Sequence, residues 1–87
     1  MAFWQEAIRT RYRVWYSRNG EMRYGSVNSP EEGKRVIVAQ ALADLKDDSV
    51  AVNVFGLEEH EDDGWHEWYD EEGNDIDHMV DAALAVA

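Results

Sequence analysis

The dipeptide Asn19-Gly20 constrains the fold of this chain more than any other stretch of its sequence. An Asn-Gly pair favours a two-residue hairpin, because both central positions of a type I′ turn need a positive φ angle. Residues 9–17 alternate and are rich in aromatic and β-branched types, which is typical of a strand. The sequence therefore predicts a β-hairpin centred on residues 19 and 20.

The turn also predicts the register of this hairpin. Pairing of Arg18 with Glu21 across the turn places Trp15 opposite Tyr24. The second strand then runs to about Val27.

A helix signal follows the hairpin. Ser29 suits the capping position, Pro30 suits the first helical position, and Glu32 completes a Ser-x-x-Glu capping box. The residues that follow repeat with helical spacing, so we expect one apolar face to pack on a sheet. That face comprises Ile37, Val38, Ala41, Leu42 and Leu45.

The second half of the chain predicts two more strands and a helix. We expect strands over residues 49–57 and 65–70, joined by an acidic loop around residues 58–64. Asn74 or Asp75 suits the cap of a last helix. Its expected apolar stripe comprises Ile76, Met79, Val80, Ala83 and Leu84.

Together these elements predict one small α+β domain over residues 1–87. We expect the order ββαββα, with a mostly antiparallel four-stranded sheet, one long helix packed on one face and a short C-terminal helix. The first seven or eight residues are compatible with a short helical turn or with irregular packing.

Charge is distributed very unevenly along the chain. The formal net charge is −11, and residues 49–87 contain twelve acidic side chains and no Lys or Arg. Most of the arginines lie before residue 24. Even complete internal pairing leaves a negative excess, which must face solvent, cations or a basic partner.

Composition and motifs argue against several function classes. The chain has no Cys, so neither a disulfide nor thiolate zinc is expected, and no stretch has the pattern of a signal peptide or a membrane span. We expect a soluble, cytoplasmic protein. No serine lies in a nucleophile-elbow pattern, so we expect no catalytic residue, no enzyme activity and no cofactor.

Metal binding is also not expected. His60 and His66 do not form an HExxH or zinc spacing. Residues 70–77 lack the ligand order of an EF-hand calcium loop. We interpret these side chains as solvated loop residues.

Arginines alternate with aromatics on the first strand, a pattern compatible with direct binding of nucleic acid. Arg11, Arg13 and Trp15 would share a face with Tyr24 and form a stacking surface. A strongly negative chain repels a polyanion, however. We favour the alternative that the arginine stems cover the sheet and pair with nearby acids.

The acidic surface is therefore the feature on which a functional hypothesis depends. Alternate carboxylates on a strand lie about 6.6–6.8 Å apart, comparable to backbone phosphates. Large aromatics among them suit the anchoring of an interface, although we expect either Trp65 or Trp68 to be core. The predicted partner-binding residues are Glu58, Glu59, Glu61, Asp62, Asp63, Trp65, Glu67, Trp68, Tyr69, Asp70, Glu71, Glu72, Asp75 and Asp77.

In composition and size the chain resembles the small acidic inhibitors of phages and plasmids, the anti-restriction and anti-CRISPR proteins that act as DNA mimics. The likeness is one of charge and length, so no residue role is carried over. It implies a stoichiometric inhibitor that occupies the basic groove of a nucleic-acid-handling protein such as a nuclease. Two alternatives stay open: an immunity or antitoxin protein that neutralises a basic toxin, and a generic acidic interaction module, as a monomer or homodimer.

Overall fold

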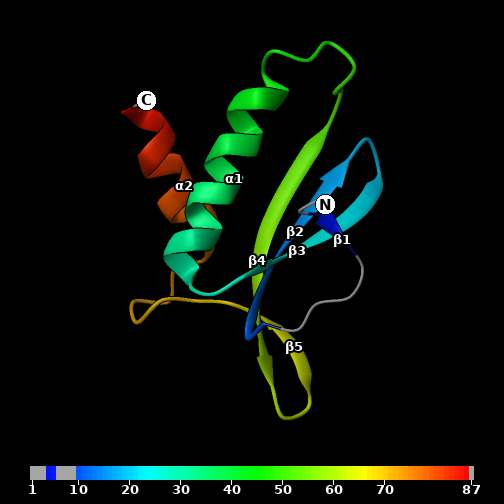
Figure 1. Ribbon diagram of the computed structural model, residues 1–87. Helices are drawn as coiled ribbons and strands as arrows, with labels where there is room; N and C mark the ends of the chain where they lie inside the picture. Colours follow the sequence, from blue (N-terminus) through cyan, green and yellow to red (C-terminus); the bar gives the residue numbers. More distant parts are fainter. Residues whose placement is uncertain (1–3, 6–9, 87) are drawn as a thin grey trace.

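The computed structural model describes residues 4–5 and 10–86 of this chain. In chain order the elements are β1 (Trp4–Gln5), β2 (Tyr12–Arg18), β3 (Glu21–Val27), α1 (Pro30–Asp44), β4 (Asn53–Glu61), β5 (Gly64–Glu67) and α2 (Ile76–Ala85). The sheet order is β1-β3-β2-β4-β5, and every neighbouring pair is antiparallel. Both helices lie on the same side of the sheet (Figure 1). The expected α+β fold is confirmed.

The first hairpin forms as predicted. Asn19 and Gly20 have positive φ angles of 51° and 86°. Arg18 pairs with Glu21, and Trp15 lies opposite Tyr24. The local turn chemistry therefore determined the register of the two strands.

The N-terminal segment adds a strand to the sheet. Trp4–Gln5 forms a fifth strand, β1, on the outer edge of β3, so the helical turn considered for this segment is wrong at these two positions. The rest of that expectation lies outside the described residues.

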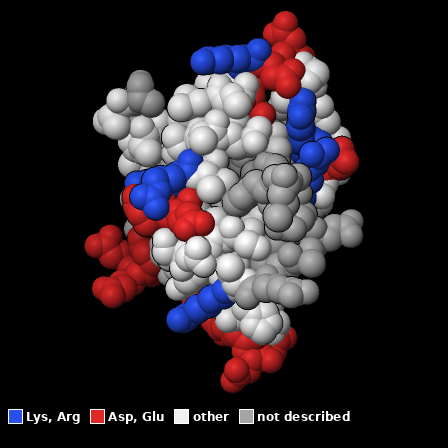
Figure 2. All heavy atoms as spheres, in the orientation of Figure 1, with Lys and Arg blue, Asp and Glu red and all other residues white. Residues whose placement is uncertain are grey.

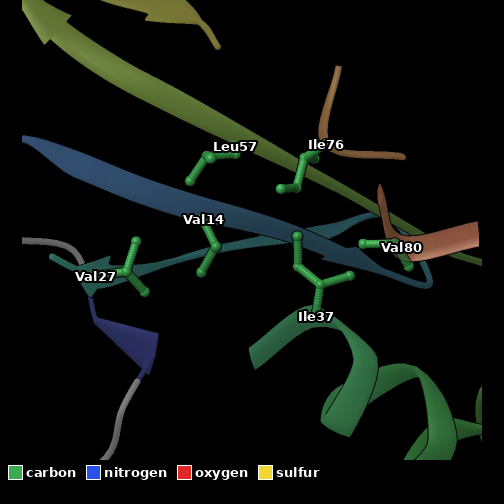
Figure 3. Close-up of a cluster of buried hydrophobic side chains, with 6 residues drawn as sticks. All are labelled: Val14, Val27, Ile37, Leu57, Ile76 and Val80. Carbon is green, nitrogen blue, oxygen red and sulfur yellow. The ribbon is translucent and has the colours of Figure 1, made fainter. Parts of the chain in front are cut away.

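The core lies between the sheet and the two helices. Its buried side chains come from three strands and both helices and converge in one cluster (Figure 3). They are Val14, Val27, Ile37, Leu57, Ile76 and Val80.

The long helix begins as expected but turns a different face to the sheet. The backbone N–H of Glu32 donates to the Ser29 side chain over 3.1 Å, which confirms the cap. The buried positions are Gly33, Ile37 and Asp44. The expected burial of Leu42 and Leu45 is wrong, because Leu42 is exposed and Leu45 is 81% exposed.

The helix approaches the sheet closely at Gly33, and this contact determines which face of the helix is buried. A Cβ atom at Gly33 would lie 3.0 Å from Leu57 Cδ1 and 3.3 Å from Val14 Cγ1. The helix therefore packs tightly where it has no side chain, and positions in line with Gly33 face inward along its length. Asp44 lies on that line, and the two leucines do not.

Asp44 is a buried carboxylate with three hydrogen-bond donors. It is 7% exposed and accepts from Tyr16 Oη at 2.6 Å, Gln40 Nε2 at 2.9 Å and Asn53 Nδ2 at 2.8 Å. Burial raises the pKa of this carboxyl, but the hydrogen bonds from Tyr16, Asn53 and Gln40 outweigh it, so the net pKa is lowered. The cluster ties the end of α1 to β2 and β4.

The strands of the second half are shifted from their expected positions. β4 begins at Asn53 rather than residue 49 and continues to Glu61, so residues 58–61 are strand and not loop. β5 ends at Glu67 rather than residue 70. Residues 62 and 63 form a tight turn between Glu61 and Gly64, which are paired. Within this strand, Glu58 and Glu59 form ion pairs with Arg13 and Arg11 of the first half of the chain.

The last helix follows its predicted pattern. Asp75 is the N-cap and accepts from the backbone N–H of His78. Ile76 and Val80 of the apolar stripe are buried, while Leu84 packs at the edge of the core. Neither described helix is long and apolar enough to cross a membrane.

Candidate partner-binding surface

The β4–β5 hairpin projects beyond the helix-covered part of the molecule (Figure 1). Its turn carries Glu61, Asp62 and Asp63 in succession, and all three are exposed. The adjoining Gly64 has a φ angle of 130°, a conformation that side chains rarely adopt. The tip therefore presents carboxylates on a defined turn rather than on an open loop.

Arginines from the first half of the chain neutralise the base of this hairpin. Arg13 Nε lies 2.7 Å from Glu58 Oε1, and the Arg11 guanidinium forms an ion pair with Glu59. Hydrogen bonding to Glu59 raises the pKa of Arg11. Glu58 and Glu59 are thus paired with arginines, unlike the tip residues Glu61 and Asp62.

Aromatic rings enclose the Arg13 guanidinium on the sheet face opposite the helices. Its Cζ lies 4.2 Å from the ring centroid of Tyr24 and 4.3 Å from that of Trp65, and its side chain is only 18% exposed. Such cation–π contacts stabilise a charged side chain that is partly desolvated. The prediction that these arginines pair with nearby acids is confirmed for Arg11 and Arg13.

Trp15 lies on the same face and packs over Gly56. A Cβ atom at Gly56 would lie 2.1 Å from the indole Nε1 of Trp15. Only glycine leaves room for the ring at this position. The face at the base of the hairpin is therefore a packed layer of arginine and aromatic side chains.

The three aromatics of the predicted site have different environments. Trp68 packs against the hydrophobic core, so the expectation that one of the two tryptophans is core is confirmed. Trp65 stacks on Arg13 and contacts the His60 ring edge-on, with centroids 5.0 Å apart. Tyr69 is 56% exposed and is the aromatic most accessible to a partner.

One ion pair braces the tip itself. His66 Nε2 lies 2.6 Å from Asp63 Oδ1. Hydrogen bonding to Asp63 raises the pKa of His66, and the same contact lowers the pKa of Asp63. When His66 is protonated, this contact is an ion pair between the turn and β5.

The same region groups three side chains that offer metal-ligand atoms. One ligand atom each of Glu61, Asp63 and His66 lies within 4.8 Å of the others, and all three residues are exposed. These three side chains lie close together because residues 62 and 63 form a tight turn, where the sequence had predicted a loop. Such an exposed set suits at most weak binding of a divalent cation.

The acids after β5 do not continue a strand. Asp70 accepts from the backbone N–H groups of Glu72 and Asn74, and Asp75 caps α2. Hydrogen bonding to the Asn74 backbone lowers the pKa of Asp70. The strand predicted over residues 65–70 does not reach Asp70, so the spacing of alternate strand residues does not apply to Asp70 and Glu72.

The predicted acids therefore divide into engaged and free carboxylates. Within residues 4–5 and 10–86, several have no Lys, Arg or His within ion-pair distance, namely Glu61, Asp62, Glu67, Glu71, Glu72 and Asp77. In Figure 2 the acidic atoms form separate groups, at the lower end, along one side and at the top. At the hairpin tip three successive residues, Glu61, Asp62 and Asp63, are acidic and exposed.

Across the hairpin, Glu58 lies directly opposite Glu67. Like charges in this position repel each other. Arg13 offsets the charge of Glu58, while Glu67 is exposed with no such partner among the described residues. Glu67 therefore extends the negative surface from the tip along β5.

Comparison with known protein families, with curated proteins and with solved structures finds no match for this chain.

Proposed function

We propose that this protein is a stoichiometric inhibitor that binds a basic nucleic-acid-handling protein through its β4–β5 hairpin. The observation that carries the proposal is the tip, where Glu61, Asp62 and Asp63 are exposed on a tight turn. The tip would enter the positively charged groove in which the partner binds nucleic acid. Glu67 along β5 would add a further carboxylate.

The construction of the hairpin supports this function. Its base is held by the Arg13–Glu58 ion pair and by Trp65 stacked on Arg13. A tip on such a base loses little conformational entropy when it binds, which favours affinity. A disordered acidic tail would lose much more.

The charge of the whole chain supports the same role. With a net charge of −11, the protein attracts a basic surface at long range and speeds encounter at low ionic strength. Tyr69 offers an exposed aromatic for the contact itself. Association should therefore slow as salt rises, while dissociation should depend on side chains in direct contact.

Affinity capture with the tagged protein, with duplex DNA as competitor, tests the proposal. The test variant carries Glu61→Gln, Asp62→Asn and Asp63→Asn, and the matched control carries Glu71→Gln, Glu72→Gln and Asp48→Asn. Both variants change the net charge by the same amount. We expect only the tip variant to lose a basic partner that duplex DNA also displaces.

Three results would decide against this function. Equal loss in both variants would show that general charge, not the hairpin, recruits the partner. Retention of the partner in excess duplex would show that its nucleic-acid groove is not the binding site. Recovery of a basic toxin without a nucleic-acid groove would instead favour the immunity-protein alternative.

A further inference from the structure

The strand β4 has a partner on both sides along only half of its length. β5 pairs with residues 58–61 of β4. One further bond joins the backbone N–H of Trp68 to the carbonyl of Leu57 at 2.9 Å. Beyond it the chain turns away through the Asp70 turn. Among the described residues, no strand pairs with residues 53–56 on this side.

The hydrogen bonds on the two sides of β4 show which backbone groups face this free edge. His60 donates to Arg11 and Val52 accepts from Asn19, so the even-numbered residues face β2. Leu57 faces the other way, toward Trp68. Because backbone groups alternate along an antiparallel strand, the N–H and C=O groups of Asn53 and Phe55 point to the free edge. They form a short template for another strand.

A cleft lies beside this edge, between β4 and the two helices. Its apolar lining includes Val54, Phe55, Val80 and Leu84, and further lining residues are Ile37, Ala41, Asn53, Asp77 and Asp81. Phe55 is held in place because its ring stacks on Tyr16, with centroids 4.7 Å apart and planes 3° apart. The cleft is thus open beside the same residues that offer free backbone groups.

Two carboxylates of α2 border the cleft. Asp77 and Asp81 lie one helical turn apart, and both are exposed. Partial burial raises the pKa of Asp77, as do the charges of Asp75, Asp81 and Glu67. The residues that line the cleft include no Lys or Arg. A cation at this rim would relieve repulsion between the acids.

We propose that this edge binds an extended basic-apolar segment of another protein as an additional strand beside β4. The segment's backbone would pair with Asn53 and Phe55, as in other cases of strand addition. A side chain opposite Phe55 would enter the cleft and should be apolar. Side chains two residues before and after it share the same face, and Lys or Arg at these positions would reach Asp77 and Asp81.

The observations favour such a segment over the other possible occupants. Pairing of two copies through this edge would bring together two clefts rimmed with carboxylates, on chains of net charge −11 each. The N-terminal strand β1 is held at the opposite edge of the sheet, on β3. This inference does not depend on the acidic tip of the hairpin, residues 61–63, which is a separate surface.

Nuclear magnetic resonance on the ¹⁵N-labelled full chain tests the proposal with a defined probe. The probe is the blocked peptide Lys-Val-Leu-Val-Lys, whose leucine would lie opposite Phe55. We expect shift changes at Asn53, Phe55, Val80 and Leu84, and slower amide exchange at Asn53 and Phe55. The same peptide with an N-methylated leucine keeps its charge and side chains but loses a strand hydrogen bond, so we expect no slowing of exchange.

Matched variants separate the rim from general charge. Asp77→Asn with Asp81→Asn should weaken peptide binding by about three- to tenfold, since each exposed ion pair contributes modestly. Glu71→Gln with Glu72→Gln changes the net charge equally and should leave binding unchanged. Removal of one acid from the hairpin tip, in the variant Asp62→Asn, should also leave it unchanged.

Four outcomes would overturn the proposal. They are absence of peptide binding, equal binding and exchange protection with the N-methylated peptide, shift changes confined to residues 61–67, and equal weakening by both pairs of variants. Protection of Asn53 and Phe55 in a dimer of the free protein would assign the edge to a second copy instead.

Discussion

Asp44 and the tip residue Asp62 carry the same chemical group in opposite surroundings. Asp44 is buried and accepts hydrogen bonds from Tyr16 of β2, Asn53 of β4 and Gln40 of its own helix. Asp62 is exposed on a two-residue turn with no ion-pair partner among the described residues. A buried carboxylate with satisfied hydrogen bonds organises the fold, whereas one that protrudes into water leaves its charge available to another molecule.

Replacement of Asp44 by alanine should have the largest effect. Tyr16, Gln40 and Asn53 then each lose a hydrogen bond at a buried site. We therefore expect the free energy of unfolding to fall by about 3–4 kcal/mol. Urea denaturation measures this loss. The control Asp62→Ala should change stability by less than about 0.5 kcal/mol. Similar losses in both variants would remove the contrast between the two carboxylates.

Replacement of Tyr16 by phenylalanine removes one of the three donors to Asp44. We expect a loss of about 2 kcal/mol, because the hydrogen bond reaches a charged group. Burial and the bond to Asp44 also raise the pKa of Tyr16 to about 12.

The folded protein therefore keeps the Tyr16 phenol protonated at pH values where the unfolded chain ionises it. This contribution to stability is complete below about pH 10 and is lost as pH rises toward 12. The difference in stability between the wild type and Tyr16→Phe should shrink over that range. A constant difference would show that folding does not raise the pKa of Tyr16.

The base of the hairpin should depend on Arg13. Arg13→Ala removes two aromatic contacts and the pair with Glu58, so we expect a loss of about 1–2 kcal/mol. Amide exchange should also quicken at Trp65 and Glu67. Arg23→Ala is the control, because its pair with Glu21 is exposed and 3.5 Å long, and it should change stability by less than about 0.5 kcal/mol. Unchanged exchange in β5 would show that Arg13 does not hold the hairpin.

The smallest expected effect concerns the contact between His66 and Asp63. Asp63 raises the pKa of His66, so Asp63→Asn should return that pKa toward its ordinary value, as measured by proton shifts of the imidazole. In the wild type this contact contributes to stability below the ordinary histidine pKa and is lost as pH rises through the folded value. Asp62→Asn serves as the control and should shift the pKa less. An equal shift in both variants would show that His66 senses the general field of the tip.

The sequence predicted which acidic residues form the candidate site but only part of the backbone structure that carries them. The acidic residues of the tip were identified correctly as exposed, yet their hairpin was mistaken for a loop. Asp63-Gly64 is a dipeptide typical of turns and would have indicated a hairpin here, although the central residues of the turn are 62 and 63. The pairing of Glu58 with Arg13 was not predicted in detail, because these residues lie 45 positions apart in the chain.

Local chemistry in the sequence determined the first hairpin and the start of both helices. A turn that needs positive φ at Asn19 and Gly20, and caps at Ser29 and Asp75, act within a few residues and need no distant partner. Tertiary structure alone decided which face of α1 is buried, which acids are neutralised and which half of β4 remains open. Each of these three features depends on side chains that are distant in the sequence. Asp44 is buried because Tyr16 and Asn53 of two strands reach it, whereas Asp62 is exposed at the end of a hairpin.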